Sequence, residues 1–208
     1  MNKKPIAILL VILMFVLSAC GALKDATVST IYVDKNGKVS SVTIASLPAE
    51  QYDEKELKKS IDDAIDDYNG SQEKVELDSF KVKKEQAHLL LTYATTKDYE
   101  SFNGRVLFAG TMAEARSAGY NFEGEFIDSK KVTTTGSAIL KEAIDELVII
   151  TNEPVQIKTS KDILYVSANA TIIDKRVAQV EAEAGATDNG ITFGNAENAY
   201  IIYGEPKK

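Results

Sequence analysis

Few residues in this sequence have an obvious potential for catalysis, because the chain contains one histidine, His88, and one cysteine, Cys20. Histidine titrates near neutral pH and often serves as a general base in enzymes. The segment from Gln86 to Tyr93 reads as a strand, and its alternation places His88 on the same side as Leu90. No catalytic partner is indicated, so we interpret His88 as a sheet residue that faces solvent or the edge of a helix.

Cys20 directly follows a segment that is typical of protein export. Lys3 and Lys4 precede an apolar run from Ile6 to Leu17. This run is too short to cross the roughly 30 Å hydrocarbon layer of a membrane, but it suits the apolar part of a secretory signal peptide. It ends in Leu17-Ser18-Ala19-Cys20, which resembles the bacterial lipobox.

The lipobox resemblance implies cleavage before Cys20 and diacylation of its sulfur. The chain would then be held by lipid at the extracytoplasmic face of the cell membrane, with the lipid bilayer as its partner. The alternatives are an ordinary signal peptide that is cut nearby and a transmembrane anchor that is never cut. We expect residues 1–19 to form the signal peptide, 20–26 the lipidated N-terminus and a tether, and 27–208 a single extracytoplasmic domain.

The composition limits the possible functions further. A lipidated Cys20 leaves no free thiol, so a disulfide, cysteine catalysis and thiolate metal sites are excluded. Removal of Lys3 and Lys4 with the signal peptide changes the formal net charge from −7 to −9. Such an acidic chain repels nucleic acid and anionic lipid head groups. The absence of tryptophan also disfavours a carbohydrate-binding protein, although tyrosine can stack on sugars instead.

Four aspartates, Asp62, Asp63, Asp66 and Asp67, form the most concentrated group of acidic residues. Their spacing of one helical turn could let carboxylates share a hard cation such as calcium. They lie opposite the apolar stripe of a predicted helix, however, and lysines are interleaved with them at salt-bridge spacing. We therefore interpret them as a solvated helix face, and we predict neither a metal site nor a cofactor.

Aromatic residues gather in the least regular part of the sequence and provide the candidate for a binding site. Tyr99, Phe102, Tyr120 and Phe122 lie among asparagine, glycine and glutamate residues, and Phe126 follows them. Aromatic side chains on loops are frequent ligand contacts. They also frequently cover a hydrophobic core. The first four are our predicted ligand-binding residues, and both interpretations stay open.

The predicted elements that would position these residues begin with a hairpin. Residues 28–34 and 38–46 favour strands around the turn Asn36-Gly37. An amphipathic helix follows, with Asp53 as its N-cap and an apolar stripe that includes Ile61 and Ile65. Residues 75–82 and 87–95 favour two further strands, so the chain opens in the order ββαββ.

The sequence pattern after residue 96 is less regular, and its predicted elements are shorter. Thr111 to Glu114 predicts a capping box at the start of a short helix, and residues 137–147 predict a second amphipathic helix. Short strands are predicted near 106–109, 125–127, 155–157, 163–166, 170–173 and 200–203, and residues 185–198 are predicted as a surface loop. The fold class is therefore α+β with mainly antiparallel sheet. A weak duplication of segments 27–96 and 105–203 is a further hypothesis.

These observations favour a noncatalytic lipoprotein that binds a small ligand, a wall component or a surface protein. No nucleophile and base stand out in the sequence, so no catalytic residue is predicted. The alternative is a cell-envelope hydrolase that uses a carboxylate pair, which the 31 acidic residues could supply.

Overall fold

The structure is a computed structural model that describes residues 20–47, 52–182 and 197–205. The predicted signal peptide and nearly all of the predicted loop at 185–198 lie outside these residues. The described part confirms the α+β class and the opening order ββαββ. None of its helices combines the length and the apolar character that crossing a bilayer requires.

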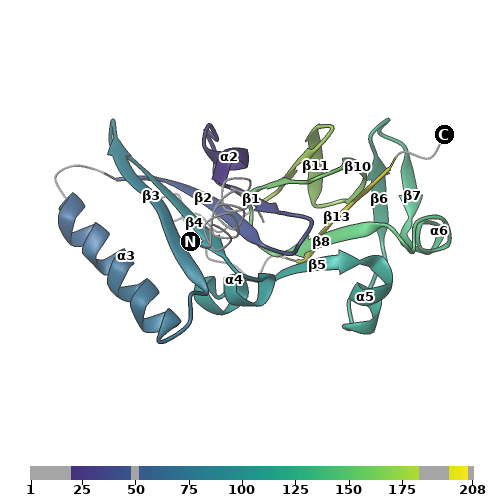
Figure 1. Cartoon of the computed structure of the whole chain (residues 1–208). Helices are drawn as coiled ribbons and strands as arrows, with labels where there is room; N and C mark the ends of the chain where they lie inside the picture. The colour runs from purple at the N-terminus through teal and green to yellow at the C-terminus, as the bar shows by residue number, and fades with distance from the viewer. Residues whose placement is uncertain (1–19, 48–51, 183–196, 206–208) are drawn as a thin grey trace, which may run out of the picture.

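The first sheet joins strands from both halves of the chain (Figure 1). Its order is β11-β12-β9-β1-β2-β4-β3. The pair β1–β9 is parallel, and all the other neighbouring strands of this sheet are antiparallel. The strands are β1 (Thr30–Val33), β2 (Val39–Ser46), β3 (Val75–Lys83), β4 (Gln86–Tyr93), β9 (Gln156–Lys158), β11 (Ala170–Asp174) and β12 (Val177–Val180).

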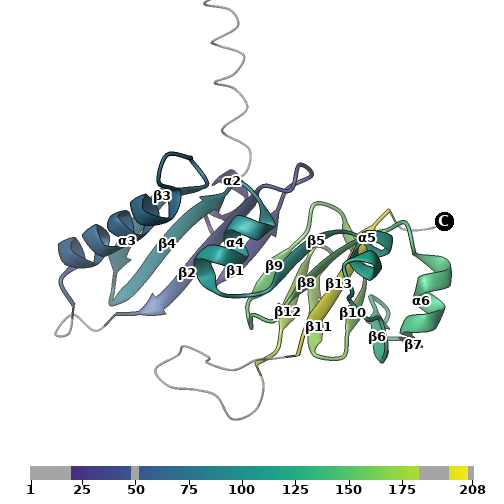
Figure 2. The ribbon, with the colours of Figure 1, turned by 90° about the horizontal axis from the view of Figure 1, so that it is seen from below.

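The second sheet is antiparallel throughout and has the order β5-β8-β13-β10-β6-β7. Its strands are β5 (Leu107–Thr111), β6 (Glu125–Asp128), β7 (Thr133–Thr135), β8 (Leu147–Thr151), β10 (Asp162–Ser167) and β13 (Ala199–Gly204). Figure 2 shows the two sheets side by side, with the first sheet ending at β3 and the second at β7.

The helices are short apart from α3 (Glu54–Asn69). Asp53 caps α3 by accepting hydrogen bonds from the backbone N–H groups of Lys55 and Glu56, as predicted. Thr111 and Glu114 form the predicted capping box of α5, each side chain bonding the other's backbone N–H. The described helices are α2 (Cys20–Leu23), α3, α4 (Thr96–Asn103), α5 (Met112–Ser117) and α6 (Gly136–Glu142).

One hydrophobic core is shared by the two sheets. It contains Ile31 and Val39 of the first sheet together with Leu107, Ile149 and Ile201 of the second, all nearly or completely inaccessible to solvent. Residues of both segments, 27–96 and 105–203, therefore contribute to this core. Strands β9, β11 and β12 of the second segment belong to the sheet that the first segment begins.

Three local predictions differ from the structure. The second amphipathic helix ends at Glu142 instead of 147, because Ala143 leaves helical geometry with φ −134° and Leu147 already begins β8. Helix α4, capped by Thr95, was not predicted. The expected tether at 20–26 is partly helical and packed: Leu23 is only 2% exposed, and Lys158 Nζ donates a hydrogen bond of 2.9 Å to the carbonyl oxygen of Ala22.

Candidate functional site

The four aromatic residues predicted as ligand contacts lie in two different clusters. Tyr99 and Phe102 pack against Tyr93, with ring centroids 4.9 and 5.9 Å away. Tyr120 packs against Phe108 at 5.2 Å, and Phe122 packs against Tyr200 at 5.1 Å in the second cluster. These contacts support the core interpretation, and the four residues do not share one surface. Tyr99 also lines a cavity.

This cavity lies where β1 and β2 meet the segments that follow α4 and β8. Its volume is about 170 Å³. Three of its lining residues are Tyr99, Arg105 and Glu153, and we call them the Tyr99–Arg105–Glu153 group. Residues 29–31, 41–45 and 154–155 complete the wall.

The geometry of the group follows from local turns. Gly104 ends α4 in a left-handed conformation, φ 64°, and so directs the chain out of the helix immediately before Arg105. Glu153 follows β8, where its backbone N–H donates to Thr151 Oγ1 at 3.2 Å. Asn152 Oδ1 accepts from the backbone N–H of Val106 at 3.0 Å, which holds the two segments together. The carboxylate of Glu153 then accepts a 2.5 Å hydrogen bond from the Tyr99 hydroxyl.

Burial dominates the electrostatics of the group. It raises the pKa of Glu153, although the hydrogen bond from Tyr99 and the positive charge of Arg105 oppose that increase. The pKa of Tyr99 is raised well above its ordinary value, first by burial and then by the charge of Glu153. The Tyr99 hydroxyl therefore stays protonated and donates its hydrogen bond. The group offers a fixed carboxylate, a guanidinium and hydroxyls for binding polar atoms.

The other residues with potential chemistry lie elsewhere. His88 is half-buried and lines a separate hollow beside α2, on the same side of the sheet as Leu90, as the alternation predicted. Two of the four aspartates of α3 pair with lysines: Lys58 Nζ lies 2.6 Å from Asp62 Oδ2, and Lys59 Nζ lies 2.5 Å from Asp63 Oδ2. In residues 20–47, 52–182 and 197–205, no three His, Cys, Asp or Glu side chains are arranged to hold a metal ion.

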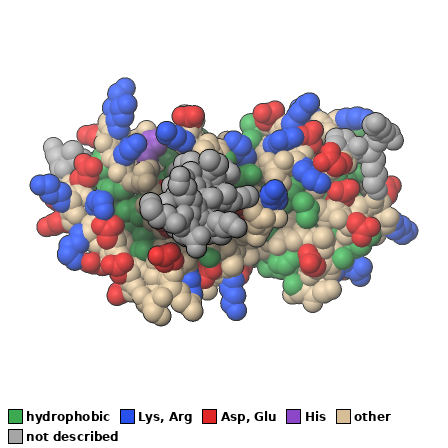
Figure 3. Space-filling view, viewed as in Figure 1, with side chains coloured by type: hydrophobic (Ala, Val, Ile, Leu, Met, Phe, Trp, Pro, Cys, Tyr) green, Lys and Arg blue, Asp and Glu red, His purple; other side chains and the backbone are tan. Residues whose placement is uncertain are grey.

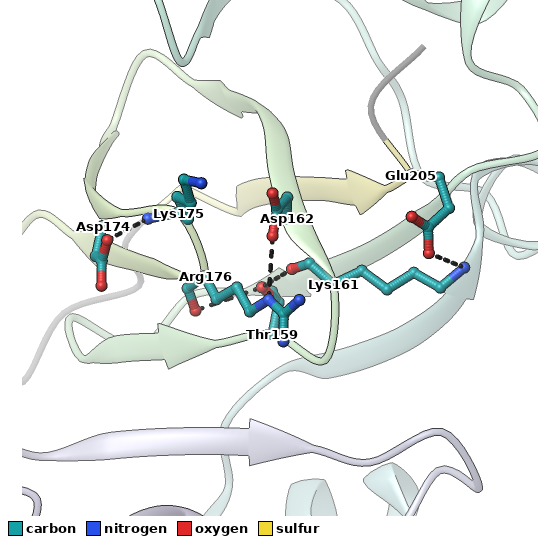
Figure 4. Close-up of polar contacts among 7 residues, drawn as sticks. All are labelled: Thr159, Lys161, Asp162, Asp174, Lys175, Arg176 and Glu205. Atoms are coloured by element: carbon teal, nitrogen blue, oxygen red, sulfur yellow. Dashed lines mark hydrogen bonds and ion pairs between the residues drawn. The ribbon is translucent and has the colours of Figure 1, made fainter. Parts of the chain in front are cut away.

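A polar network at the turn between β9 and β10 is structural (Figure 4). Thr159 is buried, and its hydroxyl donates to the carbonyl oxygen of Lys161 at 2.7 Å. Arg176 Nε pairs with Asp162 Oδ1 at 3.1 Å, and Lys161 Nζ lies 3.5 Å from Glu205 Oε1. These contacts fasten the β11–β12 hairpin and the end of β13 to the start of β10.

Glutamates gather at one further hollow, of about 660 Å³, next to β6. Glu123, Glu125 and Glu197 line it, together with asparagine side chains and Tyr200. All three glutamates are exposed to solvent. A hydrolase of this type holds its two carboxyl groups in a cleft that shields one of them from water. This hollow therefore gives little support to a carboxylate-pair mechanism.

Comparisons of the chain with models of protein families, with curated proteins and with solved structures found no match. Any functional assignment therefore depends on the residues of the site and their geometry. Arg105 and Glu153 were not predicted as site residues. The tripeptide Asn152-Glu153-Pro154 favours a turn. Nothing in it indicates a contact with Tyr99, which is 54 positions away in the chain.

Proposed function

We propose that this chain is an extracytoplasmic lipoprotein, anchored in the cell membrane through acylated Cys20, and that its domain is a noncatalytic binding module. The cavity with the Tyr99–Arg105–Glu153 group is its ligand site. The lipobox-like sequence at 17–20 supports the anchor. The observation that carries the binding role is the Tyr99–Glu153 hydrogen bond at the wall of this cavity, beside Arg105.

The cavity fits a small polar ligand better than an apolar one. Arg105 and Glu153 offer opposite charges within one small volume, and Ser29, Thr30 and Ser41 are among the other residues that line it. A ligand with both a cationic and an anionic group, such as an amino acid or the end of a short wall peptide, can pair with both. Partly buried charged hydrogen bonds of this kind are stronger than neutral ones.

The cavity favours binding over hydrolysis. Its lining contains one carboxylate, that of Glu153, whereas a carboxylate-pair hydrolase requires two at roughly 5–10 Å. The Tyr99 hydroxyl is held as a donor and its pKa is raised, which makes it a poor nucleophile. The alternative of an envelope hydrolase would therefore need a site other than this cavity.

Ligand binding is tested by thermal unfolding of residues 20–208 carrying Cys20→Ser, which retains α2. Amino acids, wall peptides, sugars and divalent cations are the ligands to compare. A ligand at 100 times its dissociation constant adds about 2.7 kcal/mol, and we expect a shift in Tm of roughly 5–10 °C for amino acids or wall peptides. Glu153→Gln should abolish the shift, while Glu73→Gln in an exposed turn should retain it.

A shift that survives Glu153→Gln would place the ligand elsewhere and contradict the assigned site. The anchor is tested separately by mass spectrometry of the N-terminal peptide from the native membrane. A peptide that begins at Cys20 with two acyl chains is expected, and Cys20→Ser should leave the protein uncleaved and without lipid. A mature N-terminus at any other residue would overturn the proposed lipoprotein.

A further inference from the structure

Helix α2, which begins at the proposed first residue of the mature chain, is held against the domain. Leu23 of α2 packs against Val42 of β2 and Leu90 of β4 in a small buried cluster. The hydrogen bond from Lys158 to the carbonyl oxygen of Ala22 fixes the helix from the other side. Any lipid on Cys20 is therefore attached at a defined place on the first sheet.

This attachment lies on the face of the sheet that α3 leaves uncovered. Neighbouring residues of a strand point to opposite faces. Leu91 of β4 belongs to the main core together with Ile65 of α3, whereas Leu90 contacts α2. The face that carries Leu90 and His88 is therefore the outer face of the sheet, and α2 covers only part of it.

Beside α2 this outer face forms a hollow of about 510 Å³ with cationic side chains around it. Lys24, Lys81 and Lys83 line the hollow, and Asp78 is the one carboxylate among its lining residues. Asp78 accepts a 2.6 Å hydrogen bond from Thr92 Oγ1. Asp25 follows Lys24 in the chain but lines a different hollow, toward β9. We call this region, from Lys24 to Lys83 around the hollow, the α2 surface.

The charge of the α2 surface is opposite to that of the whole domain. The mature chain carries a formal net charge of −9, which follows from −7 when Lys3 and Lys4 are removed. At the α2 surface, three lysines stand against one aspartate. Figure 3 shows blue lysine and arginine side chains gathered around the purple histidine, beside green hydrophobic ones. A partner for this region must therefore be anionic and must accept some apolar contact.

We infer that the α2 surface is the side of the domain that lies on the bilayer, with Lys24, Lys81 and Lys83 contacting the phosphates of anionic lipid head groups. This inference rests on the proposed lipid anchor. At a helical rise of 1.5 Å per residue, Lys24 lies about 6 Å along the chain from Cys20. A bilayer that holds the lipid of Cys20 would therefore lie close to Lys24. The attraction between a lysine and a lipid phosphate extends over roughly 8 Å at physiological salt.

Docking of this kind fixes the orientation of the domain. Long lysine side chains can reach the head groups while their apolar stems and Leu23 stay close to the protein. Figure 2 shows α2 beside the first sheet, and β6 and β7 at the far end of the second sheet. The cavity of the Tyr99–Arg105–Glu153 group is lined by residues outside the α2 surface, apart from Val42, which both hollows share.

The inference can be tested with the full lipidated chain in vesicles. Cys20 is the only cysteine and its sulfur would carry lipid, so an introduced cysteine is the only free thiol. Ser79→Cys places a fluorescent label in the α2 surface, and Ser129→Cys places the same label in the exposed turn after β6. The vesicles contain phosphatidylcholine with or without phosphatidylglycerol, and a nitroxide on a lipid head group is the quencher.

We expect quenching at position 79 and little at position 129 in vesicles that contain phosphatidylglycerol. Each lysine near an anionic surface raises the docking equilibrium constant about five-fold, so Lys81→Glu with Lys83→Glu should lower that constant by on the order of 25-fold or more. The matched control, Lys130→Glu with Lys131→Glu, should leave quenching unchanged.

Two results would overturn the docking inference while leaving the anchor intact. One is equal quenching at positions 79 and 129. The other is quenching that changes neither with phosphatidylglycerol nor with the lysine substitutions. Mass spectrometry of the same preparation reports the acyl chains on Cys20 directly. Its failure to find them would refute the anchor itself, so the two failures are distinguishable.

Discussion

At the scale of single residues, the most unusual feature is a carboxylate placed where burial opposes its charge. Glu153 lies in a turn, yet it shares a cavity wall with Tyr99 and Arg105 and accepts the Tyr99 hydrogen bond. The neutral carboxyl group would be less costly to bury than the carboxylate. The position therefore lowers the stability of the fold at neutral pH, as expected of a group retained for binding.

The burial of Glu153 makes the unfolding free energy depend on pH, and the direction of that dependence follows from its raised pKa. The folded-state pKa of Glu153 is raised above the ordinary value of about 4.3. Its contribution to stability is therefore fully present below that value and is lost as pH rises through the folded-state pKa. We expect the unfolding free energy of the wild type to fall relative to that of Glu153→Gln as pH rises from about 4 toward neutrality.

Urea unfolding at a series of pH values measures this difference. Glu73→Gln removes the same charge from an exposed turn and shows how much of the change comes from net charge alone. A difference between wild type and Glu153→Gln that stays constant across the range would contradict the prediction.

At the scale of elements, α2 contributes more than its four residues indicate. It connects the first strand of the domain with the proposed lipid, and Leu23 is its buried contact, 2% exposed. A four-residue helix has no stability of its own in water. Its conformation therefore depends on the sheet beneath it.

Leu23→Ala tests this dependence. Loss of a buried leucine side chain costs about 2–5 kcal/mol in well-packed cores, and we expect about 2–3 kcal/mol at this peripheral site. The control is Val28→Ala, since Val28 is 43% exposed and its loss should change stability by less than about 0.5 kcal/mol. Chemical denaturation of residues 20–208 carrying Cys20→Ser measures both. Equal effects of the two substitutions would show that α2 does not rest on the sheet.

At the scale of the whole molecule, the two sheets behave as one body because they share a core. Ile201 of β13 is completely buried and belongs to the cluster that also contains Ile31 of β1. A change in one sheet should therefore destabilise both. We therefore expect segments 27–96 and 105–203 to unfold together.

Ile201→Ala should lower the unfolding free energy by about 2–5 kcal/mol and leave a single transition. Tyrosine fluorescence and far-ultraviolet circular dichroism should report the same midpoint in urea. Ile173→Ala, at a side chain that is 57% exposed, is the control and should shift the midpoint little. Two separated transitions in the Ile201 variant would disprove a shared core.

Local patterns predicted most of the elements, whereas the candidate site depends on contacts that no local pattern contains. Asp53 and the Thr111–Glu114 capping box were identified because caps act within three residues. Helix α4 was missed because its eight residues carry little amphipathic signal. The Tyr99–Glu153 hydrogen bond joins residues 54 positions apart. It forms only because the tertiary fold brings α4 next to the turn after β8, and a local sequence pattern does not contain that information.

The parallel pairing of β1 with β9 has a consequence for how the protein reaches its place. Thr30 is in register with Gln156, so the first strand has no partner on that edge until most of the chain is present. A chain threaded through a membrane from its N-terminus cannot close this sheet midway. Such long-range pairing also makes folding slow. If the chain is exported as proposed, its first sheet can close only after β9 has emerged on the outer side.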